Sequence, residues 1–383
     1  MINSKHLLRP SSIHCLHSSL ERFCSRTALA KSRVSRCLAA LPASTTSSKS
    51  FAQVHLPVGR STSVYQKRRM TSINTSVLGQ SGECYFIERV LQEKEIPPHR
   101  VCLASVKNGR RFIVKNVSPS DFEYFRDIYH TLEGGHCLRL LHDSVPEQSI
   151  FIYEYLTHDL LELARKDLPL TLTKRILRDA LRGIATLHHR DIVHTDVKAN
   201  NILIELKDGS HGLEILKVEL ADIEDGAYVS PERDIVGKQV GNYMWRSPEA
   251  HAMGRVNKPS DMFSFGVVCI YAMLQSVIFD ISNEELDEDI EPLAVVLERQ
   301  ISYFADEEGL AGMFRHLGDN PWSQIFEVIR DGFNKTNPRK PFSLWKGLDA
   351  DFKDLVGGMT NFDPAKRLTA DEALQHRWFK GIQ

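Results

Sequence analysis

Hydrophobic and polar residues alternate in four short runs between residues 84 and 156. These runs are Tyr85 to Leu91, Val101 to Val106, Arg111 to Val117 and Ser149 to Tyr155. Alternation with a period of two, in runs rich in β-branched and aromatic residues, predicts β-strands. One stretch among them, residues 120–132, has helical spacing instead, with apolar side chains at Phe122, Phe125, Tyr129 and Leu132. The pattern therefore predicts a small antiparallel sheet with one helix packed against it.

From His158 onward the spacing of hydrophobic residues becomes helical, most clearly over residues 172–188 and 260–274. A β-rich segment followed by a longer helical one predicts an α+β fold with two lobes, joined near residues 154–157. Ligands tend to bind in the cleft at such a joint. We expect one domain over residues 83–381, with a small β-rich lobe at 83–156 and a larger helical lobe at 157–381.

The first 82 residues differ in composition from the rest. They contain 12 Lys or Arg and a single acid, Glu21, which leaves 36 basic and 48 acidic residues in the remainder. A Ser-rich and Arg-rich segment without sustained periodicity, apart from a candidate helix at 18–41, predicts a poorly ordered extension. It is typical of a mitochondrial transit peptide, or of a basic tail outside the functional protein with Met70 as an internal start.

Composition places the chain among ordinary globular proteins. It has 383 residues, 42% hydrophobic and 25% charged, and its net charge of -1 argues against nucleic-acid binding, which needs an excess of basic residues. The seven cysteines are scattered without a C-x-x-C pair, as in reducing compartments. The longest apolar run, residues 265–274, is too short to span a membrane. We expect an intracellular protein of the cytoplasm or nucleus, or of the mitochondrion if the extension is a transit peptide.

The most informative stretch is residues 194–201, which read H-x-D-x-K-x-x-N and precede the β-like residues 202–204. Phosphoryl transfer needs a carboxylate to accept a proton, a cation near the phosphate and oxygen ligands for Mg²⁺. Asp196, Lys198 and Asn201 supply these groups at short spacing. The alternative interpretation is a polar turn between a helix and a strand.

This stretch resembles the catalytic loop of eukaryotic protein kinases, and other landmarks of that family follow in order. They are the sequence Asp222-Ile223-Glu224 at the place of D-F-G, residues 241–249 at the place of G-T-x-x-Y-x-A-P-E, residues 261–266 at D-x-W-S-x-G, and residues 363–369 at D-P-x-x-R-x-T. The resemblance covers residues 85–379 and is nearest to divergent kinase-like proteins of fungi. It implies a bilobal kinase fold with a buried ion pair between Glu249 and Arg367.

The resemblance also implies a function: transfer of the ATP γ-phosphate to Ser or Thr hydroxyls of protein substrates, with Mg²⁺. Asp196 would be the base, Lys198 would face the γ-phosphate, Asn201 and Asp222 would bind metal, and Lys115 would hold the α- and β-phosphates. A Lys at position 198 is typical of the Ser/Thr class rather than the Tyr class.

Residues 152–160 resemble the hinge of cyclin-dependent kinases. Tyr153 would be the gatekeeper, and the backbone from Glu154 to Leu156 would bind adenine. Asp159 would bind ribose hydroxyls, although an Asp at this position is equally suited to cap a helix.

The sequence departs from the family pattern at four places. Residues 91–100, where a Gly-rich loop is expected, contain two prolines and no Gly, so this turn cannot cradle phosphates through backbone N–H groups in the family's way. The acid that should pair with Lys115 is uncertain between Glu123 and Asp127. Glu224 replaces the Gly of D-F-G, which puts the geometry of that loop in doubt. Thr195 replaces the Arg of H-R-D, so we expect activity without loop phosphorylation.

The alternative to catalysis is a pseudokinase, a nucleotide-binding scaffold or regulator.

Overall fold

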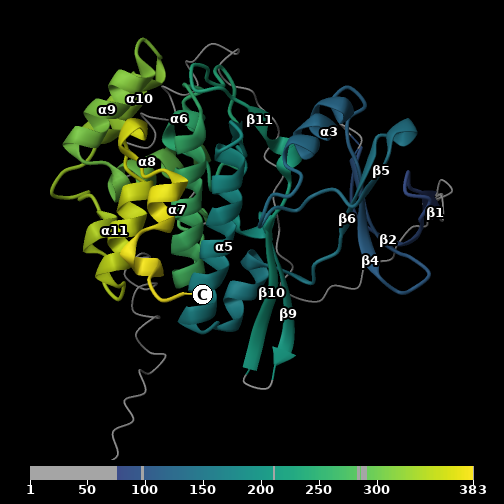
Figure 1. The fold of residues 1–383 in the computed structure, drawn as a ribbon. Helices are drawn as coiled ribbons and strands as arrows, with labels where there is room; N and C mark the ends of the chain where they lie inside the picture. Colours follow the sequence, from purple (N-terminus) through teal and green to yellow (C-terminus); the bar gives the residue numbers. More distant parts are fainter. Residues whose placement is uncertain (1–75, 96–98, 210–211, 283–284, 286–290, 383) are drawn as a thin grey trace, which may run out of the picture.

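The computed structural model describes residues 76–95, 99–209, 212–282, 285 and 291–382. A β-rich part with one helix lies beside a larger helical part, as the hydrophobic pattern predicts (Figure 1). The candidate helix at 18–41 and nearly all of the basic extension lie outside the described residues.

The small lobe is built on one antiparallel sheet with the strand order β1-β2-β3-β4-β6-β5. Its strands are β1 (Ser76–Leu78), β2 (Cys84–Lys94), β3 (His99–Ser105), β4 (Arg111–Asn116), β5 (Asp143–Val145) and β6 (Ile150–Glu154). The four alternating runs correspond to β2, β3, β4 and β6. Because β1 and β5 are three residues long, they show no alternation in the sequence. Since β1 pairs with β2, the sheet begins before residue 83, and the domain boundary there stays a prediction.

Helix α3 (Phe122–Thr131) covers one face of this sheet through its apolar side. The ring of Phe122 stacks on that of Phe151 in β6, with 4.6 Å between ring centroids. Ile128 and Tyr129 are buried on the same side, while Glu123 and Asp127 are exposed. The helical spacing of the sequence thus identifies the face that packs, and it places both acids on the opposite face.

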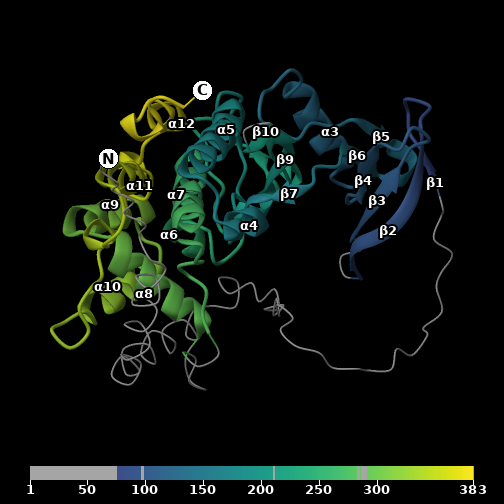
Figure 2. The ribbon, with the colours of Figure 1, turned by 90° about the horizontal axis from the view of Figure 1, so that it is seen from below.

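The large lobe is mainly helical, with α5 and α7 at its centre (Figure 2). Its helices are α4 (Leu160–Leu163), α5 (Leu170–His188), α6 (Pro248–His251), α7 (Lys258–Leu274), α8 (Pro292–Phe304), α9 (Glu307–Leu317), α10 (Trp322–Asp331), α11 (Ala350–Met359) and α12 (Ala370–Leu374). The side chains of α7 are buried on nearly all sides, which explains why its apolar run is continuous rather than one-sided. Trp378 packs in the core.

Two small sheets connect the helices to the cleft. One contains β7 (His158–Asp159), β9 (Ile202–Gly209) and β10 (Gly212–Leu220), and the other pairs β8 (Ile192–Val193) with β11 (Ala227–Tyr228). The H-x-D-x-K-x-x-N stretch lies between β8 and β9, and Asp222 follows β10. Because β9 and β10 are antiparallel neighbours, the start of one lies beside the end of the other, which brings Asn201 and Asp222 to the same end of the hairpin.

The expected ion pair between Glu249 and Arg367 is present and fully buried. The guanidinium binds both carboxylate oxygens, at 2.6 and 2.8 Å, and a further Nη1 hydrogen bond reaches the Pro259 carbonyl. Their side chains are 1% and 0% exposed. Burial would raise the pKa of Glu249, but Arg367 outweighs it and lowers that pKa. The pair joins the start of α6 to a loop close to the C-terminus.

Candidate active site

Asp196 lies on the loop between β8 and β9 with its carboxylate held at both oxygens. Oδ1 accepts a hydrogen bond of 2.7 Å from the backbone N–H of Asn242, and Oδ2 pairs with Lys198 Nζ. Gly241 makes this approach possible, because its φ is 77° and a Cβ there would lie 2.3 Å from the Thr195 carbonyl oxygen. The side chain of Asp196 is therefore fixed in orientation beside the ammonium of Lys198.

The backbone of the same loop is anchored by Asp261 at the start of α7. The Asp261 carboxylate, 1% exposed, accepts hydrogen bonds from the N–H groups of His194 (2.7 Å) and Thr195 (2.9 Å). Thr195 has a φ of 64°, a conformation that β-branched residues rarely adopt, so these contacts maintain a strained backbone. The hydroxyl of Thr195 donates to the Asp225 carbonyl at 2.8 Å, which ties this loop to the segment that follows Asp222.

Asn201 and Asp222 lie close together at the end of the β9–β10 hairpin. The Nδ2 of Asn201 donates to the Asp196 carbonyl at 3.0 Å, and the backbone oxygen of Asn201 accepts from Ala221 N at 2.8 Å. Burial opposes ionisation of Asp222, but Lys115 outweighs burial and lowers its pKa, so the carboxylate is charged. One amide oxygen and one carboxylate are the ligand types that Mg²⁺ prefers, so the two side chains fit a magnesium site in their chemistry.

Lys115 in β4 reaches into the cleft and pairs with two carboxylates. Its Nζ lies 2.9 Å from Asp222 Oδ1 and 3.3 Å from Glu224 Oε2. Burial would lower the pKa of Lys115, but the charges of Glu224 and Asp222 outweigh burial and raise it. Neither Glu123 nor Asp127 takes part: Glu123 pairs with Arg126 on the surface of α3, and Asp127 is exposed. The expectation that one of them pairs with Lys115 is wrong, because both lie on the outer face of the helix.

The hinge residues lie where β6 leaves the small lobe. Leu156 is 7% exposed, and Glu154 turns its carboxylate away to pair with Lys217 in β10 at 2.7 Å. Asp159 caps α4, because its Oδ1 accepts from Glu162 N at 2.9 Å, so the capping alternative is confirmed. Binding of ribose by Asp159 stays a prediction.

An arginine that the sequence did not single out contacts the hinge. Arg139, in the loop between α3 and β5, donates from Nη2 to the Glu154 carbonyl at 2.9 Å. Its guanidinium lies over the Tyr153 ring, 4.9 Å from the centroid. One of the backbone acceptors expected to bind adenine is therefore already hydrogen-bonded to a side chain.

The Gly-free turn joins β2 to β3, where the family's phosphate loop is expected. The two strands pair up to Lys94 and His99, so only residues 95–98 remain between them, and residues 96–98 lie outside the described part of the chain. Arg100 pairs with Glu93 across the two strands. Antiparallel pairing, with register shifts at Ile87/Arg89 and Val90/Gln92, thus continues almost to the turn.

The sequence and fold were compared with known proteins. The protein kinase domain model matches residues 127–379, more than half of the chain. The chain belongs to the protein kinase family. Among solved structures, the yeast RNA Pol II CTD kinase CTDK-1 complex has a chain with a TM-score of 0.59 to this kinase domain at 20% identity, covering 84% of this chain and 98% of that one. At that identity the likeness concerns the fold, and it confirms the bilobal kinase architecture.

Curated relatives of this kinase domain include three named kinases. Extracellular signal-regulated kinase 1 of Dictyostelium discoideum is 26% identical over 72% of this chain and 51% of its own length. Cyclin-dependent kinase B2-1 of Oryza sativa subsp. japonica is 24% identical over 60% and 65%. Serine/threonine-protein kinase SSN3 of Phaeosphaeria nodorum is 27% identical over 73% and 72%. The chain thus spans about half the length of the first relative. Among the helices of the described residues, none has the length and apolar character of a membrane span.

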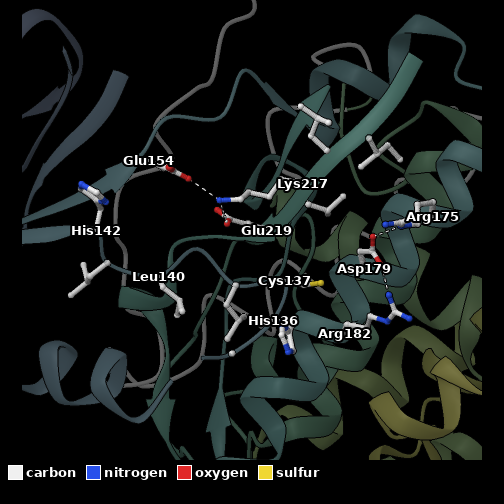
Figure 3. Close-up of a pocket in the computed structure, with 16 residues that line it drawn as sticks. His136, Cys137, Leu140, His142, Glu154, Arg175, Asp179, Arg182, Lys217 and Glu219 are labelled. Atoms are coloured by element: carbon white, nitrogen blue, oxygen red, sulfur yellow. Dashed lines mark hydrogen bonds and ion pairs between the residues drawn. The ribbon is translucent and has the colours of Figure 1, made fainter. Parts of the chain in front are cut away.

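A separate cavity of about 710 Å³ lies behind the hinge of this kinase domain (Figure 3). Its wall carries two groups of ion pairs, one from Lys217 to Glu154 and Glu219, and one on α5 from Asp179 to Arg175 and Arg182. Asp196, Lys198, Asn201 and Asp222 are not among its lining residues. The side chain of Glu154 therefore belongs to this cavity, and only the backbone of Glu154 is left for a nucleotide.

Sequence reasoning missed three contributors to the nucleotide side of the site: Glu224 as the partner of Lys115, Tyr129 and Arg139. The sequence does carry a signal for Glu224. An acid replaces the Gly of the motif in a chain whose helix at 120–132 has no clear acidic partner for Lys115. Tyr129 fell on the apolar face of α3 and was assigned to the core, although a buried Tyr hydroxyl needs a partner. Arg139 gave no signal, since a single Arg in a loop is usually exposed.

Proposed function

We propose that this chain is a protein Ser/Thr kinase that transfers the γ-phosphate of ATP, with Mg²⁺, to hydroxyls of a protein substrate. The observation that carries the proposal is the position of Asp196, whose carboxylate is fixed by Asn242 N and lies beside Lys198 and Asn201. The relatives of this family support it, since one of them is named a serine/threonine-protein kinase.

In this proposal Asp196 accepts the proton of the attacking hydroxyl. A base works only when it points at the proton that it removes, and the hydrogen bond from Asn242 N fixes Oδ1 while leaving its remaining lone pair available. Lys198, paired with Oδ2, places a positive charge beside the base, where it can stabilise the charge on the phosphate during transfer.

The phosphates would lie between the two lobes. Asn201 and Asp222 are the residues that would hold magnesium, which when bound neutralises phosphate charge. Lys115 reaches the same region from β4 and would bind the α- and β-phosphates, while the backbone from Glu154 to Leu156 would contact adenine. The Gly-free turn offers few backbone donors, so we expect these side chains to supply most of the phosphate binding.

The test is γ-phosphate transfer from Mg-ATP to a generic basic Ser/Thr protein by the full chain, with Asp196→Asn beside it. The substitution keeps the shape of the side chain and removes its charge, so we expect a loss of turnover of roughly 10³-fold or more, since general-base catalysis typically contributes 10²- to 10⁴-fold. Nucleotide affinity, measured in parallel, should change little. Equal turnover in both proteins would contradict the proposal.

The second candidate is a pseudokinase that binds nucleotide and regulates a partner without chemistry. The contact of Arg139 with the Glu154 carbonyl favours it, because it occupies an acceptor that adenine would use. ATP binding without turnover, unchanged by Asp196→Asn, would support this candidate instead.

We also propose that the protein works inside the cell, in the cytoplasm or nucleus, with the mitochondrion as the alternative. The support for the first placement is the scattered cysteines without a C-x-x-C pair, and the support for the alternative is the basic, Ser-rich composition of residues 1–82. Imaging the full chain fused at its C-terminus to a fluorescent protein, beside the same fusion lacking residues 2–69, distinguishes the two. Mitochondrial signal that depends on those residues would establish the alternative.

A further inference from the structure

We infer that Glu224 is the positioning residue for Lys115, in place of an acid on helix α3, so that both carboxylates that hold this lysine come from the segment following β10. The inference rests on the proposed function only in assigning Lys115 to the phosphates. It stands on geometry: Glu224 Oε2 lies 3.3 Å from Lys115 Nζ, and the Glu224 side chain is 7% exposed.

The acids in and just after α3 cannot take this part. Glu123 is 63% exposed and pairs with Arg126, and Asp127 is exposed on the same outer face. Glu133 follows the end of the helix, is 72% exposed and pairs with His130. Each of these carboxylates lies in solvent, and none forms an ion pair with Lys115. The Lys115 side chain is 14% exposed, and its ammonium is instead neutralised by Asp222 and Glu224 from the large-lobe side.

Tyr129 lies on the buried side of α3, and it is linked to Glu224 through Tyr153. The hydroxyl of Tyr153 donates to Glu224 Oε1, and the hydroxyls of Tyr129 and Tyr153 lie 3.2 Å apart. Because the single proton of Tyr153 goes to the carboxylate, Tyr129 must donate to Tyr153. Burial and the charge of Glu224 raise the pKa of both phenols, which keeps them as donors.

The contacts at Glu224 are mutually dependent. One of its carboxylate oxygens accepts from Tyr153, and the other faces the ammonium of Lys115. A buried carboxylate is stable when both oxygens have partners, and a buried Tyr hydroxyl also needs one. Replacing Glu224 by the Gly of the usual motif would therefore leave the Tyr153 hydroxyl without its acceptor and Lys115 with Asp222 as its remaining carboxylate partner.

The consequence is that α3 no longer sets the position of Lys115 through a charge. The helix contributes only a neutral hydroxyl, at the far end of a chain of two hydrogen bonds. Glu224 lies two residues after Asp222, the proposed metal ligand, which is the N-cap residue of η6 (Ile223–Asp225), so this short segment would set both the metal ligand and the lysine. A displacement of α3 should accordingly shift the position of Lys115 less than a change in the backbone conformation of η6 does.

The test measures the chemical reactivity of Lys115 in the full chain, which does not depend on turnover. An amine-reactive N-hydroxysuccinimide ester is applied at pH 8, and labelling of Lys115 is followed by peptide mass spectrometry in the wild type and in Glu224→Gln. Gln keeps an acceptor for Tyr153 but removes the charge. The amine of Lys115 then loses one of the two carboxylates that hold it, and its labelling rate should increase roughly tenfold, the value of about one contact to a charged group.

The matched controls are Glu123→Gln, Asp127→Asn and Glu133→Gln, which each remove a charge from the α3 region and should leave labelling unchanged. Unchanged labelling in Glu224→Gln, or faster labelling in any control, would overturn the inference. Thermal unfolding checks that each variant is folded. If Glu224→Gln is not, Glu224→Asp keeps the charge but shortens its reach, and should label faster than the wild type; equal rates would again overturn it. A wild type without kinase activity would contradict the proposed function alone, since labelling still reports on Glu224.

Discussion

The two lobes contribute to the site in different ways. On the large-lobe side, Asp196 and Asn201 lie on a loop whose backbone is hydrogen-bonded to the buried carboxylate of Asp261. On the small-lobe side, Lys115 depends on Glu224 from the other lobe, and the hinge carbonyl of Glu154 is held by a side chain. The large-lobe half keeps the acid, lysine and asparagine of the family's catalytic loop, whereas the small-lobe half reaches similar positions through different contacts.

This difference has a physical reason. The groups of the catalytic loop act at atoms fixed by backbone geometry, so a substitution there removes the chemistry. A lysine needs only a negative charge at the right distance, and that charge can come from any element that reaches it. The small-lobe half of a kinase site can therefore change its residues while keeping its electrostatics.

The largest effect on stability is expected from Glu249→Gln, which tests how much the buried ion pair of the large lobe contributes to folding. The substitution leaves the guanidinium of Arg367 buried without its counter-charge, and we expect unfolding free energy to fall by about 3 to 5 kcal/mol. The control is Glu308→Gln, which removes the exposed pair with Lys366 in the same lobe and should cost less than about 1 kcal/mol. Chemical denaturation measures both. Equal costs would show that burial does not make the Glu249–Arg367 pair more important for stability than the exposed one.

The pH dependence of the same pair sharpens this test. Arg367 lowers the pKa of Glu249 in the folded state despite burial. The contribution of the pair to the free energy of unfolding is therefore fully present above the pKa of an unfolded Glu, about 4.3. It is lost as pH falls through the lower folded-state pKa. The stability difference between wild type and Glu249→Gln should therefore shrink in acid, and a constant difference would show that the charge is not responsible.

A smaller effect is expected from Arg139→Ala, which tests the rearranged half. Arg139 donates to the Glu154 carbonyl, where the 6-amino group of adenine would need an acceptor; the 6-oxo group of guanine would instead accept from Arg139. Removing the guanidinium should raise affinity for Mg-ATP relative to Mg-GTP by roughly tenfold, the value of about one hydrogen bond. Calorimetric titration of both nucleotides measures the ratio. Arg126→Ala, on the surface of α3, is the control and should leave the ratio unchanged; an unchanged ratio in Arg139→Ala would remove this arginine from nucleotide recognition.

The sequence predicted the parts of the molecule whose signals are contiguous in the chain. The four longer strands, the face of α3 that packs, and the stretch from His194 to Asn201 each lie within one short segment. The Glu249 to Arg367 pair is distant in sequence, but the family pattern supplied it. The contacts of Lys115 with Glu224 and of Arg139 with Glu154 could not be predicted in this way, because they join distant segments and the family pattern supplies neither of them. Asp159 shows the limit of local reasoning: its residue type suited both a cap and a ribose contact, and the structure decides only the cap.

The smallest expected effect concerns the segment between Asp222 and Glu249, which contains a possible phosphorylation site at Ser230 before Pro231. Thr195 stands where an Arg could bind a phosphate, and its hydroxyl already donates to the Asp225 carbonyl, so the loop is tied to this segment without added charge. We expect phosphatase treatment of the full chain to leave the rate of phosphate transfer unchanged, and Ser230→Ala to match the wild type before and after treatment. A large loss of rate on treatment of the wild type, absent in Ser230→Ala, would show that another cation binds the phosphate and that the segment is not held by neutral hydrogen bonds alone.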